Sequence, residues 1–184
     1  MIRLHLLLFI LISTVLNCSS QNTQSPSSNK PGHKFPLKTY TSETKGFSIG
    51  FPANWKIKEG DMNVLATSSG KRSSKGYQPN INVLLLPGSS PENSLTMMLF
   101  VLKQNAALKH HKYDILDEKT IQLRHGEARK ITLSIYKKKP HLKAVQYYMA
   151  GRKKAYIITF RASKKQFNRY ENLFSDIIHS FRLK

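Results

Sequence analysis

The sequence has one cysteine, Cys18, and few acidic residues: 10 aspartates and glutamates stand against 30 lysines and arginines in 184 residues. A single cysteine excludes an intramolecular disulfide, so the hydrophobic core must supply the stability even in an oxidising compartment. With so few acids, no pair stands out as a general acid and base. Apolar residues make up 40% of the chain and aromatic residues 10%, so the net charge of +20 belongs to a folded protein.

Sequence patterns that signal catalysis or metal binding are also missing. The chain has no HExxH motif and no glycine-rich phosphate loop after a strand, and its histidines are scattered. The densest group of metal-ligand types, His110, His111 and Asp114, follows a predicted helix, where histidine also complements the helix dipole. We therefore predict no metal, no cofactor and no enzymatic activity, and a cryptic hydrolase remains the last of three hypotheses.

Residues 1–17 are predicted to form an export signal. Arg3 precedes an apolar run over 6–16, which is too short to span a bilayer comfortably and ends just before Cys18. This arrangement resembles the bacterial lipobox, although Asn17 stands where glycine, alanine or serine is usual. The resemblance implies that Cys18 becomes the lipid-modified amino terminus. An ordinary cleaved signal and an uncleaved anchor are the alternatives, and both also place the domain outside the cytoplasm.

Residues 18–37 are predicted to form a tether. They consist largely of Ser, Asn, Gln, Thr and Pro, which bury too little apolar surface to order themselves. A flexible coil of about 18 residues spans on the order of 25 Å, enough to hold a domain just off a membrane. Ser19 follows the cysteine where aspartate commonly signals inner-membrane retention. We therefore expect a cell-envelope location that faces the periplasm, with the outer membrane favoured.

Residues 38–184 are predicted to form one domain. Runs of β-forming residues predict strands over 47–51, 62–67, 81–86, 113–123, 128–136, 141–150 and 155–162, with the first two paired as a hairpin. Apolar residues at helical spacing predict one helix from Pro91 to about Leu108 and a second that starts after Ser163, each with the spacing of a capping box. Because the strands over 81–86 and 155–162 are apolar on both sides, helices should cover both faces of the sheet.

The stretch around the only tryptophan carries a family resemblance. Phe47 and Phe51 alternate along a short strand, and the strand ends in Pro52-x-x-Trp55. This hallmark resembles the opening of PsbP-like domains, which are grouped structurally with Mog1 and the DcrB-type bacterial lipoproteins. The resemblance implies an α+β fold, with one antiparallel sheet flanked by helices on both faces as an α/β/α sandwich. It also implies an accessory role in binding or assembly.

The basic residues suggest an anionic partner. Connections between strands place Lys137, Lys138 and Lys139 near the start of the last helix, where Lys164 and Lys165 lie, so these five form a candidate anion-binding patch. An exported protein is not expected to meet nucleic acid. The leading hypothesis is therefore a membrane-anchored, non-enzymatic accessory factor with an envelope protein as partner. The alternative is a binder of anionic lipid or envelope polysaccharide.

Overall fold

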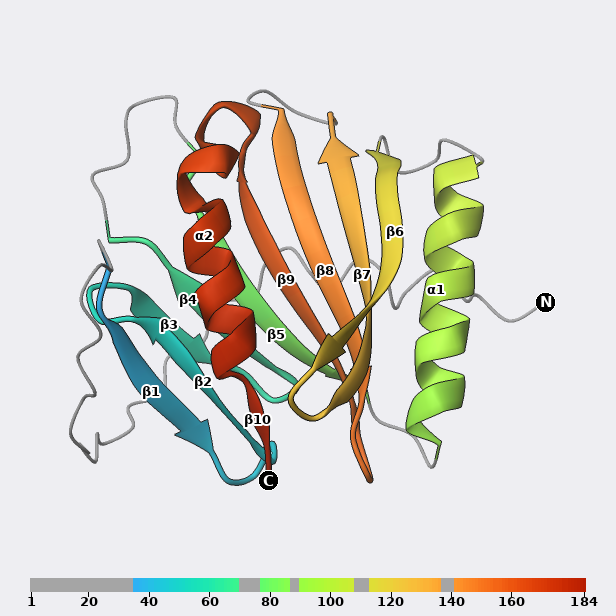
Figure 1. The fold of residues 1–184 in the computed structure, drawn as a ribbon, viewed down its shortest axis with the longest axis horizontal. Helices are drawn as coiled ribbons and strands as arrows, with labels where there is room; N and C mark the ends of the chain where they lie inside the picture. The colour runs from blue at the N-terminus through green and yellow to red at the C-terminus, as the bar shows by residue number, and fades with distance from the viewer. Residues whose placement is uncertain (1–34, 70–76, 87–89, 108–112, 137–140) are drawn as a thin grey trace.

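A computed structural model describes residues 35–69, 77–86, 90–107, 113–136 and 141–184. These residues form two antiparallel sheets and two helices (Figure 1). The small sheet has the order β1-β2-β10 and consists of β1 (Leu37–Ser42), β2 (Phe47–Pro52) and β10 (Arg182–Leu183).

The large sheet has seven strands in the order β3-β4-β5-β9-β8-β7-β6. Helix α2 lies across one face of this sheet, and helix α1 packs on the opposite face (Figure 1). The remaining elements are β3 (Lys56–Glu59), β4 (Asn63–Thr67), β5 (Asn80–Leu86), α1 (Pro91–Ala107), β6 (Tyr113–Leu123), β7 (Gly126–Ile135), β8 (Leu142–Ala150), β9 (Ala155–Ser163) and α2 (Lys164–Ser180).

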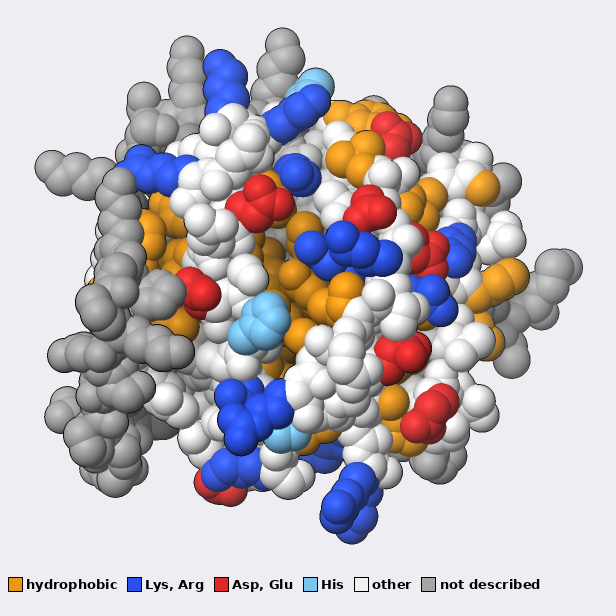
Figure 2. All heavy atoms as spheres, viewed as in Figure 1, with side chains coloured by type: hydrophobic (Ala, Val, Ile, Leu, Met, Phe, Trp, Pro, Cys, Tyr) orange, Lys and Arg blue, Asp and Glu red, His pale blue; other side chains and the backbone are white. Residues whose placement is uncertain are grey.

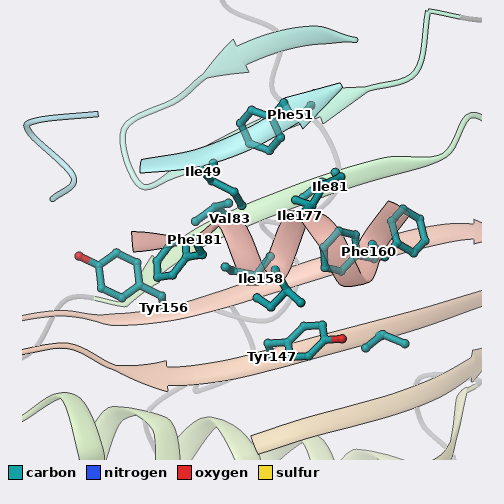
Figure 3. Close-up of a cluster of buried hydrophobic side chains, with 14 of the residues drawn as sticks. Ile49, Phe51, Ile81, Val83, Tyr147, Tyr156, Ile158, Phe160, Ile177 and Phe181 are labelled. Atoms are coloured by element: carbon teal, nitrogen blue, oxygen red, sulfur yellow. The ribbon is translucent and has the colours of Figure 1, made fainter. Parts of the chain in front are cut away.

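The larger hydrophobic core lies on the α2 face of the large sheet. Side chains from β2, β5, β9 and α2 converge there (Figure 3), among them Ile49, Val83, Phe160 and Ile177, all without exposed surface. Aromatic rings tie the layers together, with the centroids of Phe160 and Phe174 only 4.4 Å apart. This core therefore joins α2 and the small sheet to the large sheet in one packed unit.

The α1 face carries a second, smaller core around Leu102, Ile131 and Ile157. A row of polar side chains crosses the same face, because Asn82 of β5 lies opposite Thr159 of β9, which lies opposite Gln146 of β8. All three are buried, and Gln146 Nε2 donates to Thr159 Oγ1 over 3.2 Å. The hydroxyl of Tyr148 donates to Gln146 Oε1 over 2.8 Å. The two faces of the same strands therefore differ in polarity.

The helices begin with capping interactions that differ from the predicted boxes. In α1 the backbone N–H of Asn93 donates to Ser90 Oγ over 3.3 Å, so Ser90 caps the helix beside Pro91 at its first position. In α2 the Ser163 hydroxyl donates to the side chain of Gln166 over 2.8 Å instead of accepting from the helix backbone. Both helices nevertheless start as predicted, at Pro91 and directly after Ser163.

The structure confirms the α+β architecture and the helices on both faces, and it corrects the predicted sheet. The strand at 47–51 was predicted to pair with the strand at 62–67 in one sheet. In the structure β2 pairs with β1 and β10, whereas β4 pairs with β3 and β5. The prediction missed β3 because all four of its residues are exposed, so it lacks the apolar alternation of a half-buried strand.

Candidate functional site

The predicted hallmark residues lie in the core. Phe47, Phe51 and Pro52 have essentially no exposed surface. Trp55 is buried, and its ring meets the ring of Tyr170 edge-on at 6.3 Å. These side chains therefore fix β2 and the turn after it against α2, which is a role in folding.

The predicted lysine patch is only partly described. Lys164 and Lys165 are exposed at the start of α2, and the backbone N–H of Lys164 donates to the carbonyl oxygen of His141 over 2.8 Å. The remaining members, Lys137, Lys138 and Lys139, lie outside the described residues, as do Cys18, His110 and His111. The composite patch and the lipidation site therefore stay predictions.

A different basic surface lies on the open part of the α2 face. Helix α2 packs on β9, β8 and β2, and beyond it Lys119 of β6 and Lys130 of β7 stand directly opposite each other. Within the described part of the chain, neither lysine forms an ion pair. Like charges directly opposite on one face of a sheet destabilise the pairing, and a bound anion would relieve that cost. These two lysines define what we call the lysine face.

Aromatic rings and further charges surround the lysine face. Lys130 Nζ lies 5.8 Å from the ring centroid of Tyr147, and Lys143 Nζ lies 4.4 Å from that of Phe167. Burial, aided by the negative charge of Glu171, raises the pKa of Tyr147 to about 12. Figure 2 views this side and shows lysine and arginine side chains around a hydrophobic strip, with acidic side chains between them. The surface is therefore mixed in charge and partly apolar.

A shallow pocket lies between the β6–β7 turn and the end of α2. It has a volume of about 10 Å³ and is lined by residues that include His125, Met149 and His179. That volume admits about one water molecule, whereas pockets for organic ligands are typically 300–1,000 Å³. His179 Nδ1 lies 2.6 Å from the carbonyl oxygen of Ser175, so this ring is held by its own helix.

An ion pair between buried Lys45 and exposed Glu59 joins the small sheet to β3. Lys45, buried in the β1–β2 turn, lies 2.5 Å from Glu59, which also accepts hydrogen bonds from Tyr40 and Ser42. Burial opposes ionisation of Glu59, but the hydrogen bonds from Lys45, Tyr40 and Ser42 outweigh it and hold its pKa below the ordinary value. Burial and the Glu59 carboxylate raise the pKa of Tyr40. This cluster clamps the two sheets together, a role that fits structure better than catalysis.

The described residues contain no group of three or more His, Cys, Asp and Glu side chains that could hold a metal ion. No helix among them is long and apolar enough to cross a membrane.

Sequence reasoning missed the lysine face. Lys119 and Lys130 are separated by a turn, and only the register of β6 against β7 reveals that they meet. That register includes an irregularity between Ile115 and Asp117. After it, each residue of β6 lies on the opposite face of the sheet from the face that strict alternation from Ile115 would predict. The two lysines could therefore be paired from the sequence only with the bulge known in advance.

Comparison with known families identifies the chain. The family model for PsbP-like protein matches residues 6–183. The chain belongs to the PsbP-like family. No curated protein matches the sequence.

Solved structures of distant sequence share this PsbP-like fold. Cyanobacterial PsbP from Synechocystis sp. PCC 6803 matches with a TM-score of 0.61 at 12% identity, over 86% of this chain and 98% of its own. LpqN, described as involved in cell envelope biogenesis of Mycobacterium tuberculosis, matches with a TM-score of 0.57 at 13% identity, over 83% of this chain and 92% of its own. The Ran-binding protein Mog1p of Saccharomyces cerevisiae matches with a TM-score of 0.54 at 13% identity, over 82% of this chain and 96% of its own. At these identities the likeness shows the fold alone.

Proposed function

We propose that this PsbP-like protein is an exported lipoprotein, anchored by an acylated Cys18, whose domain binds a partner in the cell envelope and catalyses no reaction. The observation that carries the proposal is the apolar run over 6–16, which ends directly before the only cysteine and is followed by a polar segment. A lipid chain together with basic residues is a common two-signal membrane anchor. The net charge of +20 supplies the second signal.

The fold relatives support a binding or assembly role. One of them, LpqN, is described as involved in cell envelope biogenesis, and another, Mog1p, as a Ran-binding protein. The same architecture therefore serves proteins named for an envelope process and for protein binding. We place the chain with the DcrB-type lipoproteins on its lipobox-like residues. Because no aspartate follows Cys18, we assign it to the outer membrane, facing the periplasm.

Lipidation is tested by expressing the full chain in a Gram-negative host beside Cys18→Ala and, as a matched control, Ser20→Ala. The proposal expects that the wild type and Ser20→Ala lose residues 1–17, gain the mass of a lipid and partition into detergent. It expects that Cys18→Ala gains no lipid. Intact mass spectrometry and detergent partitioning measure both properties. A wild type that carries no lipid mass and partitions as Cys18→Ala does would overturn the lipoprotein proposal.

A second candidate function is binding of anionic lipid or envelope polysaccharide. The unpaired and directly opposed Lys119 and Lys130 favour it, and the predicted patch of Lys137, Lys138, Lys139, Lys164 and Lys165 offers a further surface. Binding to phosphatidylglycerol vesicles should weaken steeply as salt rises and should fall in the double variant Lys119→Gln/Lys130→Gln. Binding that is insensitive to salt and to both substitutions would reject this candidate.

A further inference from the structure

The polar row on the α1 face lies on interior strands of the large sheet, where buried side chains are usually apolar. Asn82 and Thr159 belong to β5 and β9, two interior strands of the large sheet. On the opposite face the same strands present only apolar or aromatic side chains, including Ile81, Val83 and Phe160. Polar side chains in the middle of a sheet cost free energy unless every donor and acceptor is paired.

Two nitrogen atoms of this region have no partner. Asn82 Nδ2 and Arg161 Nε are both buried and form no hydrogen bond in the described structure. The Asn82 side chain is 94% buried, and its oxygen is already used, because Asn63 Nδ2 donates to it over 3.1 Å. Thr159, opposite Asn82, already accepts from Gln146. The unpaired groups are therefore both donors, and the partner they lack is an acceptor.

Arg161 adds a positive charge to these donors. It lies on the same face as the polar row, opposite Asn80 of β5 and the small side chain of Ala144 of β8. Asn82 and Arg161 are thus diagonal neighbours on adjacent strands, at a separation of about 7–8 Å in a regular sheet. All 10 acidic residues lie in the described part of the chain, and none of them forms an ion pair with Arg161. Arg161 as a whole is only half-buried, so part of its side chain meets solvent although its Nε is buried.

We propose that Arg161 and Asn82 form a binding site for an oxyanion, either a carboxylate or a phosphate group of a polar ligand. The planar guanidinium matches both groups and strengthens each hydrogen bond through its charge. The buried amide of Asn82 supplies a neutral second donor, while Gln146 and Tyr148 continue the polar row toward the body of the ligand. The site lies on the opposite face from the lysine face. It does not depend on lipidation of Cys18.

The site is tested by titrating the isotope-labelled full-length protein, in mild detergent, with inorganic phosphate and separately with acetate at constant ionic strength. We expect one probe to shift the Asn82 side-chain amide signals in a saturable way, and the probe that does so identifies the group as phosphate or carboxylate. Arg161→Gln should weaken this binding at least about tenfold, because the charged donor is lost. Arg169→Gln is the matched control, since it removes an exposed charge from α2 on the other face and should leave binding unchanged.

A structural role for these residues makes a different prediction. If Arg161 and Asn82 serve a ligand, a saturating concentration of the bound probe should raise the melting temperature of the wild type but not that of Arg161→Gln, because a ligand of the folded state stabilises it. A saturable Asn82 shift in the wild type needs no variant to fold and supports the site by itself. The proposal is overturned if neither probe shifts the Asn82 amide. Equal weakening by Arg161→Gln and Arg169→Gln would also overturn it, because binding would then follow overall charge.

Discussion

The α2 face and the α1 face of the large sheet are formed by the same strands, yet along β5 and β9 only the α2 face is free of amide and charged side chains. There Val83 and Phe160 pack under α2, whereas one residue away Asn82 and Arg161 point to the α1 side with unpaired donors. Alternate residues of one strand therefore have different roles. The apolar face supplies the stability that allows the other face to carry polar groups.

The largest effect is expected from opening the α2-face core. Phe160→Ala should lower the free energy of unfolding by about 3–5 kcal/mol, because the ring is fully buried and packs on Phe174. Chemical denaturation measures the loss. Ile157→Ala on the α1 face of the same strand is the comparison, with an expected loss of about 2–3 kcal/mol. Equal losses would show that the two faces contribute alike to stability.

A smaller effect is expected from the clamp between the small sheet and β3. Glu59→Gln leaves buried Lys45 without a counter-charge and should cost about 1–2 kcal/mol at neutral pH, less than for a fully buried pair because solvent screens the exposed Glu59. Since the folded-state pKa of Glu59 lies below its ordinary value of 4.5, its contribution is present above that value. It is lost as the pH falls through the folded-state pKa.

Unfolding curves at several pH values check this prediction. The gap in stability between wild type and Glu59→Gln should be widest near neutrality and should close in acid. A gap that stays constant with pH would show that the carboxylate charge is not the source of the stabilisation.

The polar row should be less sensitive than the core. Thr159→Val removes the acceptor of Gln146 Nε2 and should cost about 1–2 kcal/mol, the penalty for a buried donor left unpaired. Thermal unfolding monitored by circular dichroism measures the change. A loss as large as that of Phe160→Ala would place the row among the main determinants of stability and would remove the contrast between the two faces.

The smallest effect is expected at the lysine face. Lys119→Gln relieves repulsion of Lys130 and should raise the free energy of unfolding by about 0.2–1 kcal/mol at low salt. The gain should vanish at high salt, where exposed charges are screened. Lys153→Gln, at the exposed β8–β9 turn, is the control of equal charge. A gain of the same size from Lys153→Gln would show that net charge, not the opposed pair, is responsible.

The sequence predicted the longer strands that are rich in β-forming residues and missed short or exposed ones. Residues 113–123 and 155–162 form β6 and β9 almost as predicted. By contrast, β3 is an exposed edge strand, and the two residues of β10 are too few to show a period. The sheet order also escaped prediction, because β5 pairs with β9 across a long separation in sequence.

The candidate sites were harder to predict than the fold. Lysines adjacent in the sequence suggested an anion-binding patch. Lys119 and Lys130 are distant in the sequence, and only the register of β6 against β7 brings them together. Arg161 and Asn82 stand out in the structure because their donors lack partners, a property that no sequence pattern carries.

The pairing of β10 with β2 has a consequence for how the protein reaches its folded state. Arg182 and Leu183 pair with Ser48 and Phe47, and the backbone N–H of Lys184 donates to Gly46. One edge of β2 therefore stays without its partner until residues 182 and 183 have been synthesised and have folded back onto it. The segment with the PsbP-like hallmark thus completes its sheet later than strands that pair with near neighbours in the sequence, because closing a long loop costs more entropy.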